Sequence, residues 1–132
     1  MSKIGVAVIG TGQWGKTHAR VYKELPSVEL VAVCDVNAER AKAMADQYGV
    51  KAYSDSAEMF KDKSIQAVNV CTWSTILFQE AMKALNAGKH VLVEKPMSTT
   101  PDQARQLVKT AQETDLHLTV GFLMRFIPGL QR

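Results

Sequence analysis

The chain has 132 residues, a formal net charge of +3, and a composition that is 46% hydrophobic and 22% charged. This length suits one domain with a sizeable core rather than two full domains, and no apolar run is long enough to span a bilayer. The basic residues are scattered, so the positive charge favours anionic ligands only weakly and does not predict a nucleic-acid surface.

The first predicted element is a strand at residues 4–9, followed directly by a loop rich in glycine. The loop consists of Gly10, Thr11, Gly12, Gln13, Trp14 and Gly15. In this pattern the first glycine allows a sharp turn, the second lets the backbone approach a diphosphate, and the third lets the next helix pack on the sheet. The free amides that begin that helix then face the phosphates. The pattern therefore predicts that these six residues bind a dinucleotide cofactor.

A helix is predicted next, at residues 13–25. Trp14, His18, Val21 and Leu25 lie along one stripe of it, which we interpret as the face toward the core. His18 is accordingly interpreted as a packed helix residue and not as a ligand.

A second strand at residues 28–34 ends at Asp35, which lies 20 positions after Gly15. A carboxylate at that place can accept hydrogen bonds from both hydroxyls of the adenosine ribose. Asp35 favours NAD as the cofactor, because its charge would repel a 2′-phosphate. Arg40 and Lys42 in the following helix leave NADP open as the alternative.

Asn37 caps that following helix and Gly49 ends it. Its expected core face consists of Ala41, Met44, Ala45 and Tyr48. After a short strand at residues 51–53, the spacing of Asp55 and Glu58 indicates a capping box for a brief helix that carries Met59 and Phe60.

The second half of the sequence continues the alternation. A strand at residues 65–71, a helix at 74–87 and a strand at 90–93 follow one another. Thr100 then caps a helix with Pro101 at its first position and Gln103 reaching back. The core stripe of that helix consists of Ala104, Leu107, Val108 and Ala111. The last predicted strand covers residues 116–123.

This alternation is typical of an α/β fold, a doubly wound parallel sheet with helices on both faces and strand order 3-2-1-4-5-6. The ligand crevice of such a sheet lies outside the carboxyl ends of its strands. Four groups of polar or special residues fall at those ends: residues 10–15, Asp35, Cys71-Thr72-Trp73 and Glu94-Lys95-Pro96. We therefore expect the crevice at this edge.

Cys34 and Cys71 are the only cysteines. Two inter-strand spacings of about 4.8 Å would separate them, which is too far for a disulfide. Neither cysteine has a metal-binding spacing with a histidine, so we expect no metal site. Free thiols and the lack of a signal-peptide pattern fit a cytoplasmic location.

The chain resembles the N-terminal, NAD(P)-binding Rossmann domain of the glucose–fructose oxidoreductase (Gfo/Idh/MocA) family over its whole length. The resemblance rests on the glycine loop, Asp35 and two further segments. These are Ala87-Gly88-Lys89-His90-Val91-Leu92-Val93-Glu94-Lys95-Pro96, and Val120-Gly121-Phe122 with Arg125-Phe126 and Pro128. Members of the family are mostly NAD(P)-dependent dehydrogenases or reductases of sugars, inositols and related polyols.

The resemblance implies that Glu94 and Lys95 lie beside the nicotinamide ribose and that Lys95 is catalytic. An ammonium group there would stabilise the charge that develops on the substrate oxygen during hydride transfer. Pro96 is a candidate for a cis peptide that directs the Lys95 side chain.

Two positions depart from the family pattern. Trp73 replaces a proline next to the cofactor, where its indole either stacks on the cofactor or covers the sheet edge. Leu77 replaces a histidine on the substrate side, which weakens any substrate assignment taken from members that keep it.

The family resemblance also bears on the end of the chain. We expect residues 1–123 to form the dinucleotide-binding domain and 124–132 to begin a linker to an absent substrate-binding domain. The piece would then bind NAD without turnover, and its apolar end would favour self-association, for instance as a homo-oligomer. One alternative is a stand-alone NAD-binding or sensing module without turnover, and another is a domain that has lost its cofactor.

Overall fold

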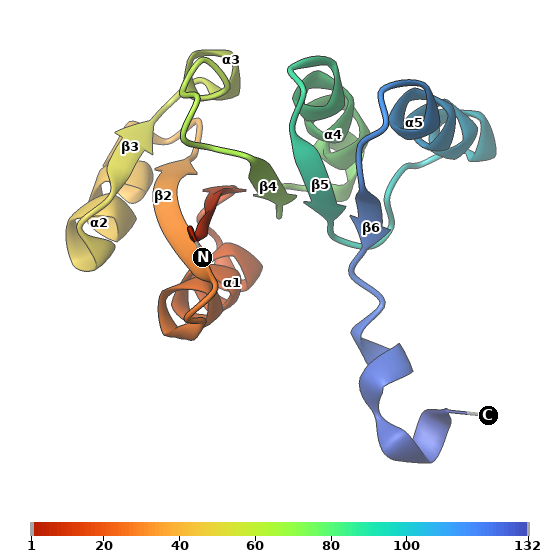
Figure 1. The fold of residues 1–132 in the computed structure, drawn as a ribbon, viewed down its shortest axis with the longest axis horizontal. Helices are drawn as coiled ribbons and strands as arrows, with labels where there is room; N and C mark the ends of the chain where they lie inside the picture. The colour runs from red at the N-terminus through yellow and green to blue at the C-terminus, as the bar shows by residue number, and fades with distance from the viewer. Residues whose placement is uncertain (1, 132) are drawn as a thin grey trace.

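The computed structural model describes residues 2–131, in which strands and helices alternate along the chain (Figure 1). The strands are β1 (Ile4–Ile9), β2 (Val28–Cys34), β3 (Lys51–Tyr53), β4 (Ala67–Val70), β5 (His90–Val93) and β6 (Leu118–Val120). The helices are α1 (Gln13–Glu24), α2 (Ala38–Tyr48), α3 (Ser56–Met59), α4 (Ser74–Asn86) and α5 (Pro101–Glu113). Two 3₁₀ turns follow, η1 (Leu123–Phe126) and η2 (Pro128–Leu130).

All strand pairs are parallel, and the sheet order is β3-β2-β1-β4-β5-β6. This confirms the predicted α/β fold and its strand order. The helices cover both faces, α1 and α2 on one and α4 and α5 on the other (Figure 1). A core cluster on the first face includes Val8, Ala19 and Met44, and a larger cluster on the second includes Met59, Leu77 and Leu107.

Local capping explains most of the helix boundaries. Asn37 accepts a hydrogen bond from the Arg40 amide and Gly49 adopts the left-handed conformation with φ 65°, so both predicted ends of α2 are confirmed. Thr100 likewise caps α5 by accepting from the Gln103 amide.

The two predicted capping boxes form only in part. Asp55 caps α3 through the Ala57 amide, but Glu58 pairs with Lys61 at 2.6 Å instead of reaching back. The Gln103 side chain accepts from the Thr99 amide, one residue before the cap. Both side chains are long and lie at exposed helix starts, so other donors compete for them.

The strands β4 and β6 are shorter than predicted. β6 pairs only with β5, which has four residues, so the ladder has no partner beyond Val120. The Phe122 amide then bonds to the Val120 carbonyl and turns the chain out of the sheet.

The predicted core stripe of α1 is wrong at both of its ends, whereas His18 and Val21 between them are half-buried. Trp14 and Leu25 are 50% and 40% exposed, and the buried residues are Gly15 and Ala19. A Cβ on Gly15 would lie 1.8 Å from the Gly10 carbonyl oxygen, so the helix starts too close to the sheet for a large side chain. Small residues at positions i and i+4 form the contact, and Trp14 is turned outward. In α5 the stripe is confirmed at Leu107 and Ala111, whereas Val108 is exposed.

After β6 the chain runs away from the sheet, and η1 and η2 lie apart from the body of the molecule (Figure 1). This segment exposes six large apolar side chains: Phe122, Leu123, Met124, Phe126, Ile127 and Leu130. Across residues 2–131, no helix is both long and apolar enough to cross a membrane.

Candidate functional site

A cleft of about 390 Å³ lies at the carboxyl edge of the sheet, where the sequence predicts the crevice. Eight of the predicted cofactor residues line it: Gly10, Gly12, Gln13, Trp14, Asp35, Arg40, Thr72 and Trp73. Thr11 and Gly15 are buried and do not line the cleft, and Glu94 and Lys95 follow β5 further along the same edge. A second cleft, of about 460 Å³, lies between α5 and the start of β6 and contains none of these residues.

The three loop glycines have different surroundings. Gly10 has φ +94°, and a Cβ there would lie 2.6 Å from the Cys71 carbonyl oxygen. Gly15 packs against the Gly10 carbonyl, as described above. At Gly12 a Cβ would meet no atom within 4 Å, so the loop is open on the side that faces the cleft.

The start of α1 is suited to an anion. Its N-cap, Gly12, provides no side-chain hydrogen bond, and there is no acidic residue in the first turn. The first amides of a helix have no acceptor inside the helix and lie at the positive end of its dipole. The loop therefore presents free N–H groups to the cleft.

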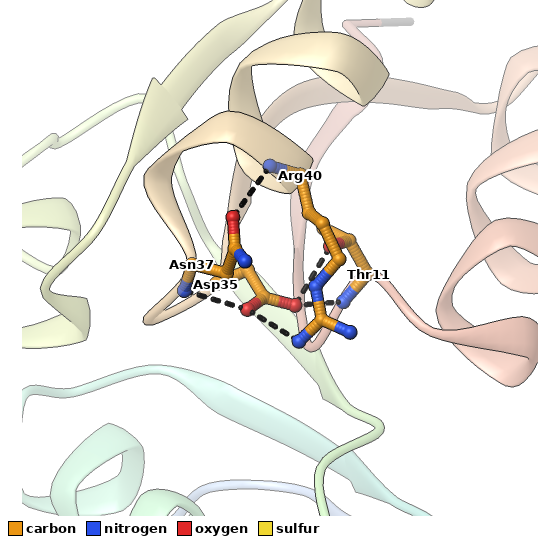
Figure 2. Close-up of polar contacts among 4 residues, drawn as sticks. All are labelled: Thr11, Asp35, Asn37 and Arg40. Atoms are coloured by element: carbon orange, nitrogen blue, oxygen red, sulfur yellow. Dashed lines mark hydrogen bonds and ion pairs between the residues drawn. The ribbon is translucent and has the colours of Figure 1, made fainter.

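Asp35 lies at the end of β2 with its carboxylate bound by four donors (Figure 2). The Thr11 amide and hydroxyl donate to Oδ2 at 2.9 and 2.7 Å. The Asn37 amide and the Arg40 guanidinium donate to Oδ1 at 2.9 and 3.1 Å. Burial alone would raise the pKa of Asp35, but the bonds from Thr11, Asn37 and Arg40 outweigh it and hold this pKa below its usual value.

Sequence reasoning assigned Asp35 to a ligand, but the structure adds a second role, because the carboxylate also fastens the glycine loop to β2. Of its four donors, two are backbone amides and one is a buried hydroxyl. The fourth, Arg40, has a side chain that is 57% exposed. Arg40 is thus the donor that can leave most easily when a ligand approaches the carboxylate.

Thr72 carries an orphaned polar atom at the cleft. Its Oγ1 is the one buried side-chain oxygen or nitrogen without a hydrogen-bond partner among residues 2–131. A buried hydroxyl without a partner costs free energy, which a bound polar ligand would offset. The open loop and this hydroxyl fit a ligand that combines an anionic group with hydroxyls or ring nitrogens, as a dinucleotide does.

Apolar side chains stand exposed around the same cleft. Trp73 is 79% exposed and Val36 90%, with Trp14 and Ile76 beside them in the lining. Such surfaces commonly contact a flat ring. Leu77, by contrast, is buried in the core at 1% exposure, so this departure from the family pattern does not face the cleft.

Sequence reasoning missed a buried carboxylate in the lining of the cleft. Glu80 of α4 accepts from the Ser56 hydroxyl at 2.5 Å and from Lys83 at 2.7 Å. Burial, with Glu80 and Asp35 nearby, raises the pKa of Cys34 to about 12. Cys34 and Cys71 are both free thiols, as predicted.

Glu94 also has a partner that the sequence did not predict. His18 Nε2 lies 2.8 Å from Glu94 Oε1, which joins α1 to the end of β5. No local pattern pairs residues 76 positions apart, even though the periodicity places His18 on a helix. Lys95 is exposed, and the peptide bond between Lys95 and Pro96 is cis, as predicted. Within the described chain, no three His, Cys, Asp or Glu side chains gather to hold a metal ion.

Comparisons with known proteins agree with this geometry. A family model described as an oxidoreductase family with an NAD-binding Rossmann fold matches residues 4–122. D-glucoside 3-dehydrogenase of Escherichia coli (strain K12) is 38% identical over 99% of this chain and 38% of its own length. Inositol 2-dehydrogenase of Salmonella typhimurium (strain LT2) is 32% identical over 92% of this chain and 38% of its own length.

Among solved structures, GenD2 from gentamicin A biosynthesis, in complex with NAD, superposes with a TM-score of 0.94 and 31% identity. The match covers 97% of this chain and 37% of GenD2. The chain thus spans between a third and two fifths of the length of these relatives.

Proposed function

Because the chain belongs to the Gfo/Idh/MocA oxidoreductase family and comprises its NAD-binding Rossmann domain, we propose that it is the cofactor half of a hydride-transferring dehydrogenase. The proposed substrate is a sugar-like molecule or polyol, oxidised at a carbinol carbon. The names of the relatives, a D-glucoside dehydrogenase and an inositol dehydrogenase, support this substrate class.

The cleft at the sheet edge carries the proposal. It combines the open face of Gly12, the free amides of α1, the Asp35 carboxylate and the orphaned Thr72 hydroxyl. In our proposal, the amides of Gly12, Gln13 and Trp14 bind the diphosphate. Asp35 accepts from the adenosine ribose, and Thr72 bonds to the cofactor.

Arg40 takes the place beside the ribose where a 2′-phosphate would lie in NADP. Its guanidinium, now paired with Asp35, would turn to the phosphate. Trp73 and Trp14 flank the cleft and contact the rings or ribose of the cofactor. Asp35 favours NAD, and Arg40 allows weaker binding of NADP.

In our proposal, Glu94 and Lys95 lie beside the nicotinamide ribose of the cofactor. Lys95 is the proposed catalytic residue, with an ammonium group that stabilises the negative charge developing on the substrate oxygen. NAD supplies the hydride acceptor when it is bound. In our proposal, the other site residues of this chain bind and orient the cofactor.

Three further properties belong to the same proposal. The chain spans 38% of the D-glucoside dehydrogenase and 37% of GenD2, so we propose that the substrate-binding residues belong to the part of such proteins that this chain does not span, and that the chain by itself binds cofactor without turnover. The two free thiols support a reducing, cytoplasmic compartment. The exposed apolar side chains around η1 support contact with another domain or a second copy of the chain.

Titration of the chain with NADH and NADPH tests the proposed function. Trp14 and Trp73 at the cleft should report binding through a change in tryptophan emission, and NADH should bind more tightly. The proposal is wrong if neither nucleotide changes the emission or the melting temperature. Clearly tighter binding of NADPH would overturn only the preference for NAD and would leave the rest of the proposal in place.

A further inference from the structure

Helix α1 carries a contact that the proposed cofactor roles do not use. His18 lies on the second turn of α1, and its Nε2 lies 2.8 Å from Oε1 of Glu94. A carboxylate oxygen only accepts, so the histidine nitrogen is the donor. The side chains of Glu94 and His18 are 11% and 23% exposed. Burying a carboxylate costs free energy unless it is paired with hydrogen-bond donors, and His18 is such a donor.

Glu94 is held by three segments that are distant in the sequence, one through its backbone and two beside its carboxylate. Its own backbone amide bonds to the Val70 carbonyl of β4, and His18 approaches from α1. Gly121, directly after β6, leaves the space that the carboxylate fills, because a Cβ there would lie 3.1 Å from Oε1. Glu94 is therefore held in one place, close to the exposed Lys95 that follows it.

The second oxygen of this carboxylate, Oε2, packs beside Gly121, where an added Cβ would lie 3.3 Å from it, and receives no hydrogen bond from the described residues. His18 occupies Oε1. Each carboxylate oxygen can accept two hydrogen bonds. Oε2 of Glu94, directly after β5, can therefore accept further hydrogen bonds.

A polar chain behind His18 fixes the imidazole. Its ring stacks on Tyr22 with ring centroids 6.2 Å apart, and the Tyr22 hydroxyl accepts from the Asn69 side chain at 2.9 Å. Asn69 is fully buried and also accepts from the Cys71 thiol. Burial raises the pKa of Tyr22, so its hydroxyl stays protonated at neutral pH. A network with satisfied partners restricts the rotation of its members.

The strand order places this pair at one end of the crevice. Asp35 follows β2 and the glycine loop follows β1, whereas Glu94 follows β5, on the far side of β4. A dinucleotide with its adenosine at Asp35 and its diphosphate at α1 therefore has its nicotinamide end on the side of β4 and β5. Helix α1 reaches both places, through the amides of its first turn and through His18.

We propose that His18 is a positioning residue for the nicotinamide half of the cofactor. It holds the Glu94 carboxylate so that Oε2 accepts a hydrogen bond from the ribose next to nicotinamide, and it thereby fixes the backbone that leads to Lys95. This role rests on the proposed function and adds a residue to it. It also predicts that a change at His18 weakens binding of the nicotinamide half without weakening binding of the adenosine and diphosphate, which lie elsewhere in the cleft.

Calorimetric titration with NADH and with ADP tests the role, since ADP contains only the adenosine and diphosphate. We expect His18→Leu to bind NADH roughly tenfold more weakly, the loss of about one hydrogen bond to a charged group, and to bind ADP within twofold of the unaltered chain. His18→Gln keeps an N–H donor and should recover most of the NADH affinity. His117→Leu removes an exposed histidine at the opposite edge of the sheet and should change neither affinity.

The outcomes separate the two proposals. If the unaltered chain binds neither ligand, the proposed function fails and the role of His18 with it. If it binds both, but His18→Leu weakens both equally or neither, only the role of His18 is overturned. A folded His18→Gln variant that binds NADH as poorly as His18→Leu also overturns it.

A second measurement avoids variants that fail to fold. In the unaltered chain, the imidazole nitrogen resonances of His18 should shift when NADH is added and stay in place with ADP. Shifts of equal size with both ligands, or none with NADH, contradict the proposed contact through Glu94.

Discussion

Thr11 donates both its backbone amide and its hydroxyl to Oδ2 of Asp35, at 2.9 and 2.7 Å. The carboxylate that follows β2 thereby holds the loop that follows β1 (Figure 2). The same group that is expected to bind the ribose therefore shapes the loop that is expected to bind the diphosphate. Loss of this carboxylate should affect stability as well as affinity.

The first prediction concerns Asp35→Asn at different pH values. Asp35 has a lowered pKa in the folded chain, so the folded state prefers the carboxylate. Its contribution is present above the unfolded pKa of about 3.9 and is lost as the pH falls through the lower folded value. We expect Asp35→Asn to lower the free energy of unfolding by about 2 kcal/mol at pH 7.

Urea denaturation of both chains at pH 7 and below pH 4 measures this contribution. The difference between the two chains should narrow on acidification, because the unaltered chain then loses the same charge. A difference that stays constant across this range would show that the charge of Asp35 does not stabilise the fold.

The second prediction contrasts two loop glycines. A methyl group at Gly15 would collide with the Gly10 carbonyl, so Gly15→Ala should destabilise the chain by about 3 kcal/mol. A methyl group at Gly12 meets no protein atom, so Gly12→Ala should cost at most about 1 kcal/mol, through the weaker N-cap preference of alanine. It should nevertheless weaken NADH binding, since the methyl group stands where the diphosphate approaches.

Thermal unfolding and NADH titration of the two variants separate packing from binding. Gly12→Ala is the matched control for Gly15→Ala, with the same added atom three residues away. Unchanged NADH affinity in Gly12→Ala would mean that the diphosphate does not approach the loop at this point.

The third prediction concerns Arg40 and cofactor choice. Arg40 donates to Oδ1 of Asp35 with a half-exposed side chain, so its removal frees an acceptor for the ribose and removes a cation from the 2′-phosphate position. We expect Arg40→Ala to weaken NADPH binding about tenfold, with no loss of NADH affinity.

Lys42→Ala is the control, because Lys42 is exposed and pairs with Asp46 of its own helix. Calorimetric titration of both variants with both nucleotides gives the comparison. Equal losses of NADH and NADPH affinity in Arg40→Ala would assign Arg40 to a contact common to both cofactors.

The sequence predicted the order of elements and the strand order, because hydrophobic periodicity and capping residues act locally. The same local signals placed Asn37, Gly49 and Thr100 at helix ends. They failed for Trp14, since the inward face of α1 is decided by how closely its first turn approaches the Gly10 carbonyl. A Cβ at Gly15 would also lie 3.5 Å from Val8 of β1, and periodicity along the helix carries no information about either contact.

In the candidate site too, the sequence identified some residues, whereas others are brought together only by the fold. Asp35 and the glycine loop follow a spacing, so the sequence identified them. The pairs His18 with Glu94 and Ser56 with Glu80 join elements that only the folded sheet brings together. Their partners have no fixed offset in the sequence, so they emerge from the structure alone.

The last prediction concerns the thiols. Cys34 is 3% exposed, and burial raises its pKa to about 12, so the reactive thiolate is scarce at neutral pH. Burial raises the pKa of Cys71 as well.

We expect both thiols to react slowly with a disulfide reagent at pH 8 in the native chain and rapidly in guanidinium chloride. Because both line the cleft, NADH should slow the native reaction further. Native thiols that react as fast as unfolded ones would contradict the burial of Cys34 and the partial burial of Cys71. A slow reaction that NADH leaves unchanged would contradict binding of the cofactor over them.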